Sequence, residues 1–423
     1  MYSLFFLMLF APTVYQPIKA VLLVVIIALV IFKILLINKG NTNLHPRVLF
    51  WTWLTTCTGA IFILIGVYKG YSGALNLLTV YFIWPWVYTL FASGFTREML
   101  DKIVRVLVYG SLAIELYILS FILTQTGKLP SWFFIELDLH QIMYMNQGVP
   151  QFSLPSLATL IFSLSFIVAA LVLWDKKENH PVSRKILWIV FVLGLLVVLM
   201  SGRRALMITV ATSFLFTLIF RVFLPKEKRK SSRKNIVSII FGSVFVSIIV
   251  FIYLQNNNYL TLSSMIYDFK SGFAFSSDES AMARASQYKA LMDGWADSPF
   301  IGQGFGGQAG DVVRNANNWQ YELQYNLLLF STGIVGTFVY LASVLWVFLT
   351  NIRIIRSGDK LAYFSIPILV GTLSFLISNA TNPYLGKYDH MWTLFLPIFV
   401  ANIWLVQNKK FKKAIKQESV VLS

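Results

Sequence analysis

Two adjacent arginines, Arg203 and Arg204, lie between two long apolar runs in the turn SGRR, residues 201–204. A guanidinium group stays protonated at any working pH, and placing one at membrane depth is costly. A turn at a membrane surface avoids that cost, and there the pair can bind a phosphate or carboxylate through paired hydrogen bonds. The alternative is that both side chains extend to the phosphates of membrane lipids. In either case the pair predicts anion binding at an interface.

A second candidate cation, Arg284, lies in the long polar stretch 255–322. This stretch contains four basic and seven acidic residues, so Arg284 is a cation in a segment whose net charge is negative. Spacing over 276–296 predicts a helix capped by Ser277 or Asp278, with Gly294 near its end. Three- and four-residue steps predict an apolar face of Met282, Ala285, Met292 and Trp295, with Arg284, Tyr288 and Leu291 on another side.

Two more candidates follow this helix. The run GQGFGG, residues 302–307, resembles a phosphate-binding loop only loosely, since no strand precedes it and no helix opens directly after it. It is more typical of a tight turn that brings backbone close to a substrate. Glu322 lies in the first turn of the helix expected from residue 317, where the helix dipole favours a carboxylate. It can serve as a charge–dipole match or as a base that takes a proton from a hydroxyl.

The elements that must position these residues are membrane-spanning helices. Hydrophobic residues make up 57% of the 423 residues and charged ones 13%, against about 25% charged in soluble domains. We predict an all-α polytopic membrane protein in which 1–423 form a single membrane domain. About twelve helices are expected from the length of the apolar runs. They lie near 2–15, 17–37, 48–68, 75–95, 103–124, 153–174, 185–201, 205–223, 236–254, 323–350, 361–380 and 391–407.

The distribution of basic residues predicts the orientation. Most of the 35 lysines and arginines fall in loops that this topology puts on one side, which is then cytoplasmic together with both termini. The segments 125–152 and 255–322 become extracytoplasmic, as does the turn with the arginine pair. The net charge of +17 is explained by topology and anionic lipid, so no nucleic-acid partner is expected. The lone cysteine, Cys57, excludes disulfides within the chain and any cysteine-based metal site.

Four stretches in this order resemble one family: SGRRAL (201–206), the segment from Arg284 through SPFIGQGFG (298–306), YELQYNLLLFSTGIVG (321–336) and SNATNPYLG (378–386). The chain resembles the O-antigen polymerase and O-antigen ligase superfamily of lipid-linked polysaccharide enzymes. The resemblance implies a metal-independent, GT-C-like glycosyltransferase without cofactor. Its donor is a glycan on undecaprenyl diphosphate, and it acts with inversion at the outer face of the cytoplasmic (inner) membrane. The family's diphosphate-binding arginines correspond to Arg204, with Arg203 beside it, and Arg284.

One departure from the family concerns the general base. The ligases have a histidine at the start of the helix after the large loop, and the matching position here is Glu322, which favours the polymerase branch. Glu322, His390 beside Asp389, His140 and the absence of any protein base all remain open. Sites predicted to bind substrate are Arg203, Tyr288, Arg314, Tyr325 and His390. Trp132, Phe133 and Trp319 can stack on sugars, although aromatic residues are common at membrane interfaces for other reasons.

The polymerase reading implies lipid-linked donor and acceptor glycans as substrates, membrane lipid as surroundings, and a chain-length regulator and a flippase as protein partners. One alternative keeps the chemistry but transfers the glycan to lipid A or protein, as a ligase does. The other is a lipid-linked oligosaccharide flippase, in which a transport site near the midplane is expected. Glu115, in the middle of the span 103–124, is the main mid-membrane acid, and a structural polar contact is the simpler explanation for it.

Overall fold

The computed structural model describes residues 1–37, 42–137, 142–146, 149–174, 180–201, 203–228, 279–312, 317 and 319–421, with short pieces between 236 and 252. Most of the predicted span 236–254 and the predicted cap residues Ser277 and Asp278 lie outside the described residues. Helices dominate the rest. Their bounds are α1 (Tyr2–Phe10), α2 (Gln16–Phe32), α3 (Pro46–Tyr68), α4 (Trp84–Gly94), α5 (Arg97–Gln125), α6 (Leu157–Leu173), α7 (Arg184–Met200), α8 (Arg204–Arg221), α11 (Glu279–Ala296), α12 (Gln324–Ser357), α13 (Ala362–Asn379) and α14 (Trp392–Val421).

The helices coincide with the predicted apolar runs, but fewer of them are long enough to span a membrane. Six helical segments of the described chain have the length and composition for it: 16–36, 46–68, 75–94, 97–125, 324–357 and 362–379. Two further apolar helices, α6 and α8, are shorter. Helix α1 has nine residues, about 14 Å at 1.5 Å per residue, so it reaches only halfway across a hydrocarbon core. These apolar helices indicate a membrane protein, while the described residues do not confirm the expected number of about twelve spans.

Helix α6 lies at the centre of the bundle. Every residue from Leu157 to Leu173 is buried, and α6 packs against α13, α8 and α7. A helix that is apolar on all sides is stable only when surrounded by other helices, which explains this position. By contrast α2 presents mostly exposed apolar side chains at the periphery, as expected of a helix that faces lipid.

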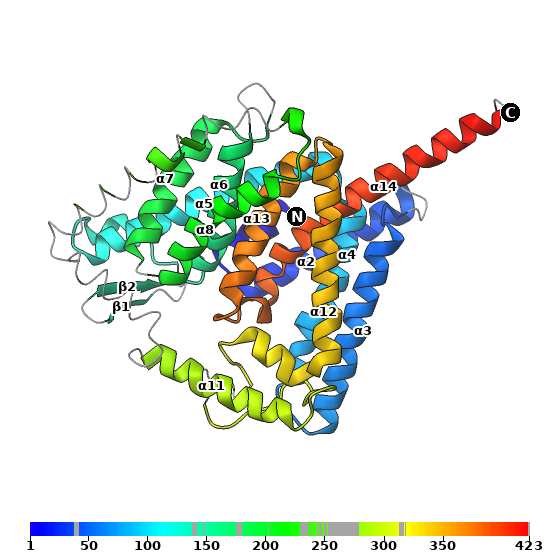
Figure 1. The fold of residues 1–423 in the computed structure, drawn as a ribbon. Coiled ribbons are helices and arrows are strands. Elements are labelled where there is room, and N and C mark those ends of the chain that lie inside the picture. Colours follow the sequence, from blue (N-terminus) through cyan, green and yellow to red (C-terminus); the bar gives the residue numbers. More distant parts are fainter. Residues whose placement is uncertain are drawn as a thin grey trace.

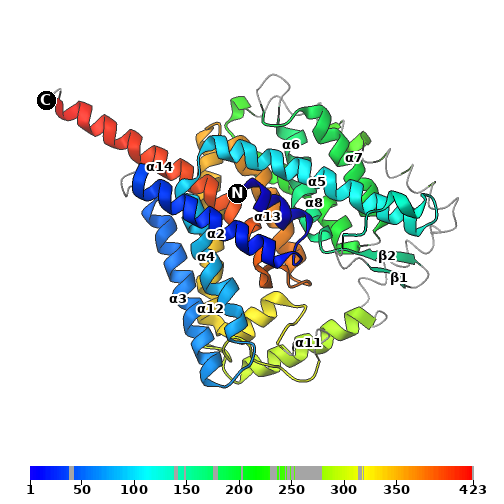
Figure 2. The ribbon, with the colours of Figure 1, turned by 180° about the vertical axis from the view of Figure 1, so that it is seen from behind.

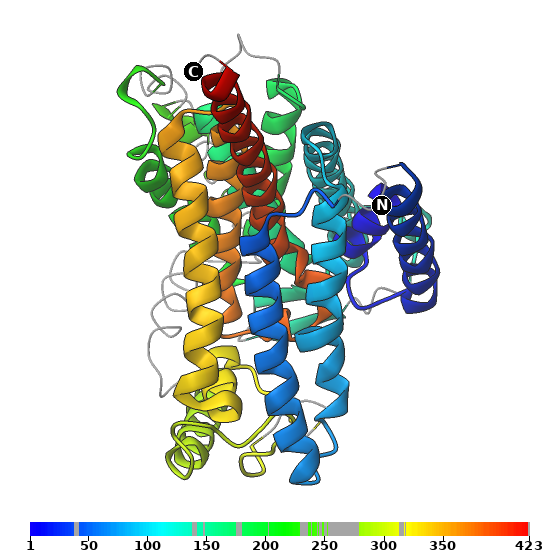
Figure 3. The ribbon, with the colours of Figure 1, turned by 90° about the vertical axis from the view of Figure 1, so that its right-hand side faces the viewer.

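The bundle has two distinct ends. In Figure 3, α12, α3 and α4 stand side by side, with α11 at one end and the C-terminal part of α14 at the other. Figures 1 and 2 both show that the orange-red turns between α13 and α14 face α11. These turns are η6 (Tyr384–Gly386) and η7 (Tyr388–His390). We call this side the α11 end of the bundle, and the candidate residues collect there.

A short hairpin interrupts the helical pattern at the α11 end. Strands β1 (Ile142–Asn146) and β2 (Val149–Ser153) pair antiparallel, with Ile142 opposite Ser153. The backbone N–H of Phe152 donates a hydrogen bond of 3.4 Å to the carbonyl of Ser201, and the Phe152 side chain is buried. The first predicted outer segment is therefore attached to the turn that carries Arg203.

The glycine-rich run packs against the protein's own backbone. Helix α12 is broken at Gly333, which has φ 58° and ψ −167°. The N–H groups of Gln303 and Gly304 donate to the carbonyls of Phe330 and Ser331 at 2.8 and 2.9 Å, so the run satisfies carbonyls that the break releases. A Cβ on Gly302 would lie 2.5 Å from the backbone nitrogen of Gly333. The run also approaches α3, since the N–H of Phe305 donates to the Phe62 carbonyl at 2.9 Å. The backbone that this run approaches closely is thus that of α12 and α3.

Candidate active site

Arg284 and Glu322 form an ion pair at the α11 end. The Nε–H of Arg284 donates to Oε2 of Glu322 at 2.8 Å, and the side chains are 34% and 21% exposed. Helix α11 supplies the arginine, and the loop before α12 supplies the carboxylate. Because Nε makes this contact, the guanidinium is held in one orientation by a partner 38 positions away in the sequence.

Gln287 fixes the carboxylate end of this pair. Its Oε1 accepts a 2.9 Å hydrogen bond from the backbone N–H of Glu322, and its Nε2 donates to the carbonyl of Val312 at 3.3 Å. Arg284 and Gln287 are three residues apart on α11 and so share one side of the helix. Glu322 itself precedes α12, which begins at Gln324. Its predicted place in the first helical turn is therefore wrong, and Gln287 and Arg284 orient it instead.

The buried side of α11 differs from the predicted apolar face. Leu291 is fully buried in a small core with Tyr321 and Phe330, and Gln287 is buried as well. Met282, from the predicted face, is 50% exposed. The apolar spacing was misleading because polar contacts from Arg284 and Gln287 decide which side of α11 meets α12. Gly294 also contributes by packing: a Cβ there would lie 2.6 Å from the Phe330 ring.

The arginine pair occupies the tight turn that the sequence predicts. Helix α7 ends at Met200 and α8 begins at Arg204. The Nε–H of Arg203 donates to the carbonyl of Phe152 at 3.3 Å, and its backbone N–H donates to Oγ of Ser201 at 3.3 Å. Arg203 is thus tied to the β hairpin. For Arg204 the structure describes the backbone only, at the start of α8.

A cavity of about 310 Å³ opens beside Arg203. Its walls come from the α1–α2 connection, the start of α6, the α7–α8 turn and the segment 382–390. Burial raises the pKa of the Tyr384 phenol, and the positive charges of Arg203 and Arg284 oppose that rise. Both guanidinium groups therefore act electrostatically on one phenol. The polar lining residues are Thr13, Arg203, Asn382, Tyr384, Lys387 and His390.

His390 and its neighbour Asp389, considered above as alternatives to Glu322 for the general base, have different environments. Burial, together with the charges of Lys387 and Lys19, lowers the pKa of His390 to about 3, so its imidazole is neutral and weakly basic at neutral pH. Asp389 is buried and accepts hydrogen bonds from the Thr13 N–H at 2.7 Å and Gln16 Nε2 at 3.1 Å, beside its ion pair with Lys19. Its oxygens are thus engaged in structure, which disfavours Asp389 as a base.

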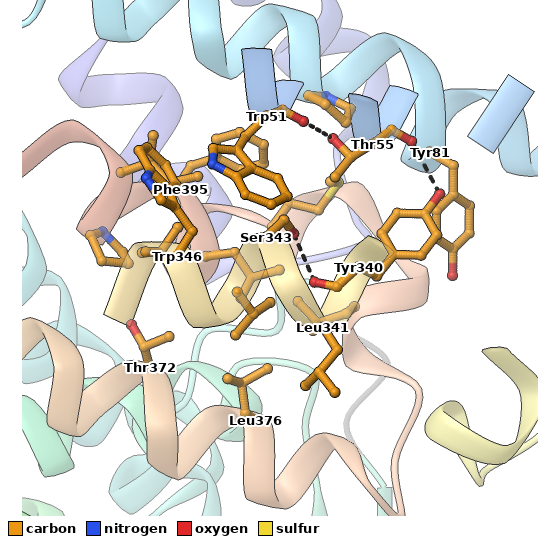
Figure 4. Close-up of a pocket in the computed structure, with 18 of the residues that line it drawn as sticks. Trp51, Thr55, Tyr81, Tyr340, Leu341, Ser343, Trp346, Thr372, Leu376 and Phe395 are labelled. Atoms are coloured by element: carbon orange, nitrogen blue, oxygen red, sulfur yellow. Dashed lines mark hydrogen bonds between the residues drawn. The ribbon is translucent and has the colours of Figure 1, made fainter. Parts of the chain in front are cut away.

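A larger apolar groove of about 500 Å³ adjoins the cavity (Figure 4). Helices α3, α12, α13 and α14 form its walls, and the rings of Trp51, Tyr340, Trp346 and Phe395 surround it. Tyr325 lines this groove and not the cavity, and its hydroxyl donates to the Leu376 carbonyl at 2.5 Å. The cavity and the groove lie on two sides of the turns after α13: Tyr384 and His390 line the polar cavity, and the residues that follow each of them, Leu385 and Met391, line the apolar groove.

The other predicted residues are dispersed. Tyr288 is 54% exposed on α11, and Arg314 and His140 lie outside the described residues. Trp132 and Phe133 are exposed, whereas the Trp319 ring packs on Gly73, where a Cβ would lie 2.3 Å from it. Glu115 is fully buried in α5, and within the described part of the chain neither of its carboxyl oxygens has a hydrogen-bond partner.

Sequence reasoning missed Tyr384, Lys387 and Asn382 as site residues. The segment SNATNPYLG was singled out only as a family stretch, and no local pattern in it indicates chemistry. Its first two residues end α13, and the position of the rest beside the α7–α8 turn depends on how α13 packs against α8. A polar Asn-Pro-Tyr sequence between two apolar spans was the available signal.

Residues 189–341 match the family model of O-antigen ligases. The matched region runs from α7 into α12 and includes Arg203, Arg204, Arg284 and Glu322. It confirms the resemblance to the O-antigen polymerase and ligase superfamily and points to a ligase- or polymerase-type glycosyltransferase. No curated protein matches the chain. The turns with Tyr384, Lys387 and His390 lie beyond the O-antigen ligase match.

Proposed function

We propose that the protein polymerises undecaprenyl-diphosphate-linked oligosaccharide repeat units into a surface polysaccharide such as O-antigen, capsule or exopolysaccharide. The observation that carries the proposal is the cavity beside Arg203, which Arg203 and Lys387 both line and in which none of the described lining residues is acidic. The charges of Arg203 and Arg284 also both act on the Tyr384 phenol in its wall. Positively charged side chains that reach one cavity from segments far apart in sequence suit a strongly anionic group. The apolar groove next to them suits the polyprenyl chain that such a diphosphate carries.

The proposed reaction is an inverting transfer at the outer face of the cytoplasmic membrane. A hydroxyl of the acceptor glycan attacks the anomeric carbon of the donor, the bond between that carbon and the diphosphate oxygen breaks, and the lipid diphosphate leaves with the electron pair. Negative charge therefore grows on the leaving oxygen. Arg204, with Arg203 beside it, and Arg284 would stabilise this charge through N–H donors, each contributing about 3 kcal/mol to lowering the barrier. Such donors can do this without a metal.

The hydroxyl proton has two destinations in this scheme, Glu322 or the departing diphosphate. Glu322 occupies the position of the ligases' histidine and holds Arg284 at 2.8 Å. We propose Glu322 primarily as the residue that orients Arg284, with proton acceptance as its competing role. His390 is the weaker candidate base because its pKa is near 3.

The decisive experiment incubates purified protein with synthetic undecaprenyl-diphosphate repeat units in the presence of a chelator. A ladder of products is expected from the wild type. Arg204→Ala and Arg284→Ala should each lower the rate about a hundredfold while the protein still accumulates in the membrane. Normal chain lengths in both variants would refute the assigned roles.

A ligase is the second candidate, favoured by the description of the matched family. It differs only in the acceptor, so lipid A and a lipid-linked glycan offered in the same reaction would separate the two. Transfer to lipid A without a ladder would establish the ligase. Movement of labelled lipid across a reconstituted bilayer without any glycan product would instead indicate a transporter.

A further inference from the structure

The cavity beside Arg203 contains a second cation that the O-antigen ligase match does not reach. Lys387 lines the cavity from the turn between η6 and η7. Among the described residues, none forms a hydrogen bond or an ion pair with its ammonium group. Partial burial lowers the pKa of Lys387, and the nearby Asp389 carboxylate opposes that change.

Asp389 does not neutralise Lys387, because it is already paired elsewhere. Its Oδ1 lies 3.1 Å from Nζ of Lys19, which is 2% exposed and also donates to the Ala11 carbonyl at 2.7 Å. Its Oδ2 accepts from the Thr13 N–H. This buried cluster ties the α1–α2 connection to the segment 387–391 and fixes the backbone from which Lys387 extends. Asp389 and Lys19 are thus positioning residues.

The remaining lining also favours an anion. None of the described residues that line the cavity is acidic, so Arg203 and Lys387 give it a net positive charge. His390 is neutral and 3% exposed, and its Nδ1 has no hydrogen-bond partner in the described part of the structure. A buried polar atom without a partner carries a free-energy cost that a ligand can remove. Among the described residues, the ammonium group of Lys387 and Nδ1 of His390 are therefore available to a ligand in this cavity.

We infer that Lys387 is a further substrate-binding residue which, together with Arg203, holds a phosphate of the lipid-linked diphosphate. This inference rests on the proposed function for the identity of the ligand. A lysine suits the task because a compact ammonium on a flexible stem binds phosphate as a point charge, whereas arginines fix its orientation. The sequence YLGKYDH by itself indicates neither the cavity nor the ligand.

The test titrates inorganic pyrophosphate into the purified full-length protein by calorimetry, with chelator present. Lys387→Met keeps the length of the stem and removes the charge, and about tenfold weaker binding or more is expected. Lys387→Arg should bind within about threefold of the wild type, since it keeps the charge. Lys289→Met is the matched control: it removes an exposed lysine from α11, outside the cavity lining, and should leave binding unchanged. Thermal unfolding of each variant checks that it folds.

The outcomes separate this inference from the proposed function. Unchanged pyrophosphate binding by Lys387→Met, equal losses in the Met and Arg variants, or a wild type that does not bind pyrophosphate would each overturn the inference. If binding behaves as expected but the wild type makes no product ladder, the proposed function fails while the anion site stands. With an active wild type, Lys387→Met should also raise the apparent KM for the lipid-linked repeat unit.

Discussion

Replacing Glu322 by glutamine and by alanine distinguishes the two roles open to this residue. Glutamine is nearly isosteric, and its carbonyl oxygen can still accept the Nε–H of Arg284 that Glu322 Oε2 accepts at 2.8 Å. It cannot act as a base. Alanine removes both functions, while the backbone contact from Glu322 N–H to Gln287 remains in either variant because it does not involve the side chain.

The size of the expected effect follows from the geometry of the pair. A charge-assisted hydrogen bond contributes about 1.5–3 kcal/mol and a neutral one about 0.5–1.5 kcal/mol. Since both side chains are partly exposed, Glu322→Gln should weaken the hydrogen bond to Arg284 by about 1 kcal/mol. If Glu322 orients Arg284, Glu322→Gln should lower kcat/KM only about five- to tenfold, and Glu322→Ala about a hundredfold. If Glu322 is the base, both variants should lose about 10²- to 10⁴-fold.

The assay follows product ladders from synthetic lipid-linked repeat units, and initial rates give kcat/KM for each variant. Asp297→Asn is the matched control, because Asp297 is an exposed acid just after α11 and its neutralisation should leave the rate unchanged. Equal, large losses in Glu322→Gln and Glu322→Ala would refute the positioning role. Wild-type rates in both would show that the ion pair has no part in the reaction.

Three further perturbations test other parts of the structure. Burial lowers the pKa of His390 from 6.5 to about 3 in the folded protein. Between pH 3 and pH 6.5 the unfolded chain is therefore protonated at His390, whereas the folded protein is not. The free energy of unfolding should therefore fall as the pH drops below about 6.5, by up to about 1.4 kcal/mol per pH unit. Unfolding measured at pH 7 and pH 5 should show a smaller fall in His390→Gln than in the wild type. Gly333→Ala places a Cβ 2.3 Å from the Phe300 carbonyl oxygen, at a residue whose φ is positive. The free energy of unfolding should fall by about 2–4 kcal/mol, seen as a lower Tm in thermal unfolding. An unchanged Tm would contradict the break in α12. Ser343→Trp fills the groove and should lower turnover of long-chain substrates more than of a short-prenyl analogue, whereas equal effects would exclude the groove as the lipid site.

The sequence by itself determined the membrane class, the bounds of most helices and the turn that carries the arginine pair. These features are local. Apolar runs of a given length define spans, and the polar turn SGRR between two of them defines a hairpin. The choice of Arg284 as a candidate also came from the sequence, because a cation in an acidic loop is conspicuous without any structure.

Tertiary structure alone decided which candidates meet. The Arg284–Glu322 pair joins residues 38 apart, and the Lys19–Asp389 pair joins residues 370 apart; periodicity carries no information at such separations. The buried side of α11 was mispredicted because Gln287 and Arg284 bind the loop before α12, so polar contacts overrode the apolar spacing. The GQGFGG run is a tight turn, as its glycines predict, but only the tertiary structure shows that it packs on the broken backbone of α12 and on α3. Tyr384 and Lys387 joined the site only through the packing of α13 against α8, which brings the turn after α13 to the cavity beside Arg203.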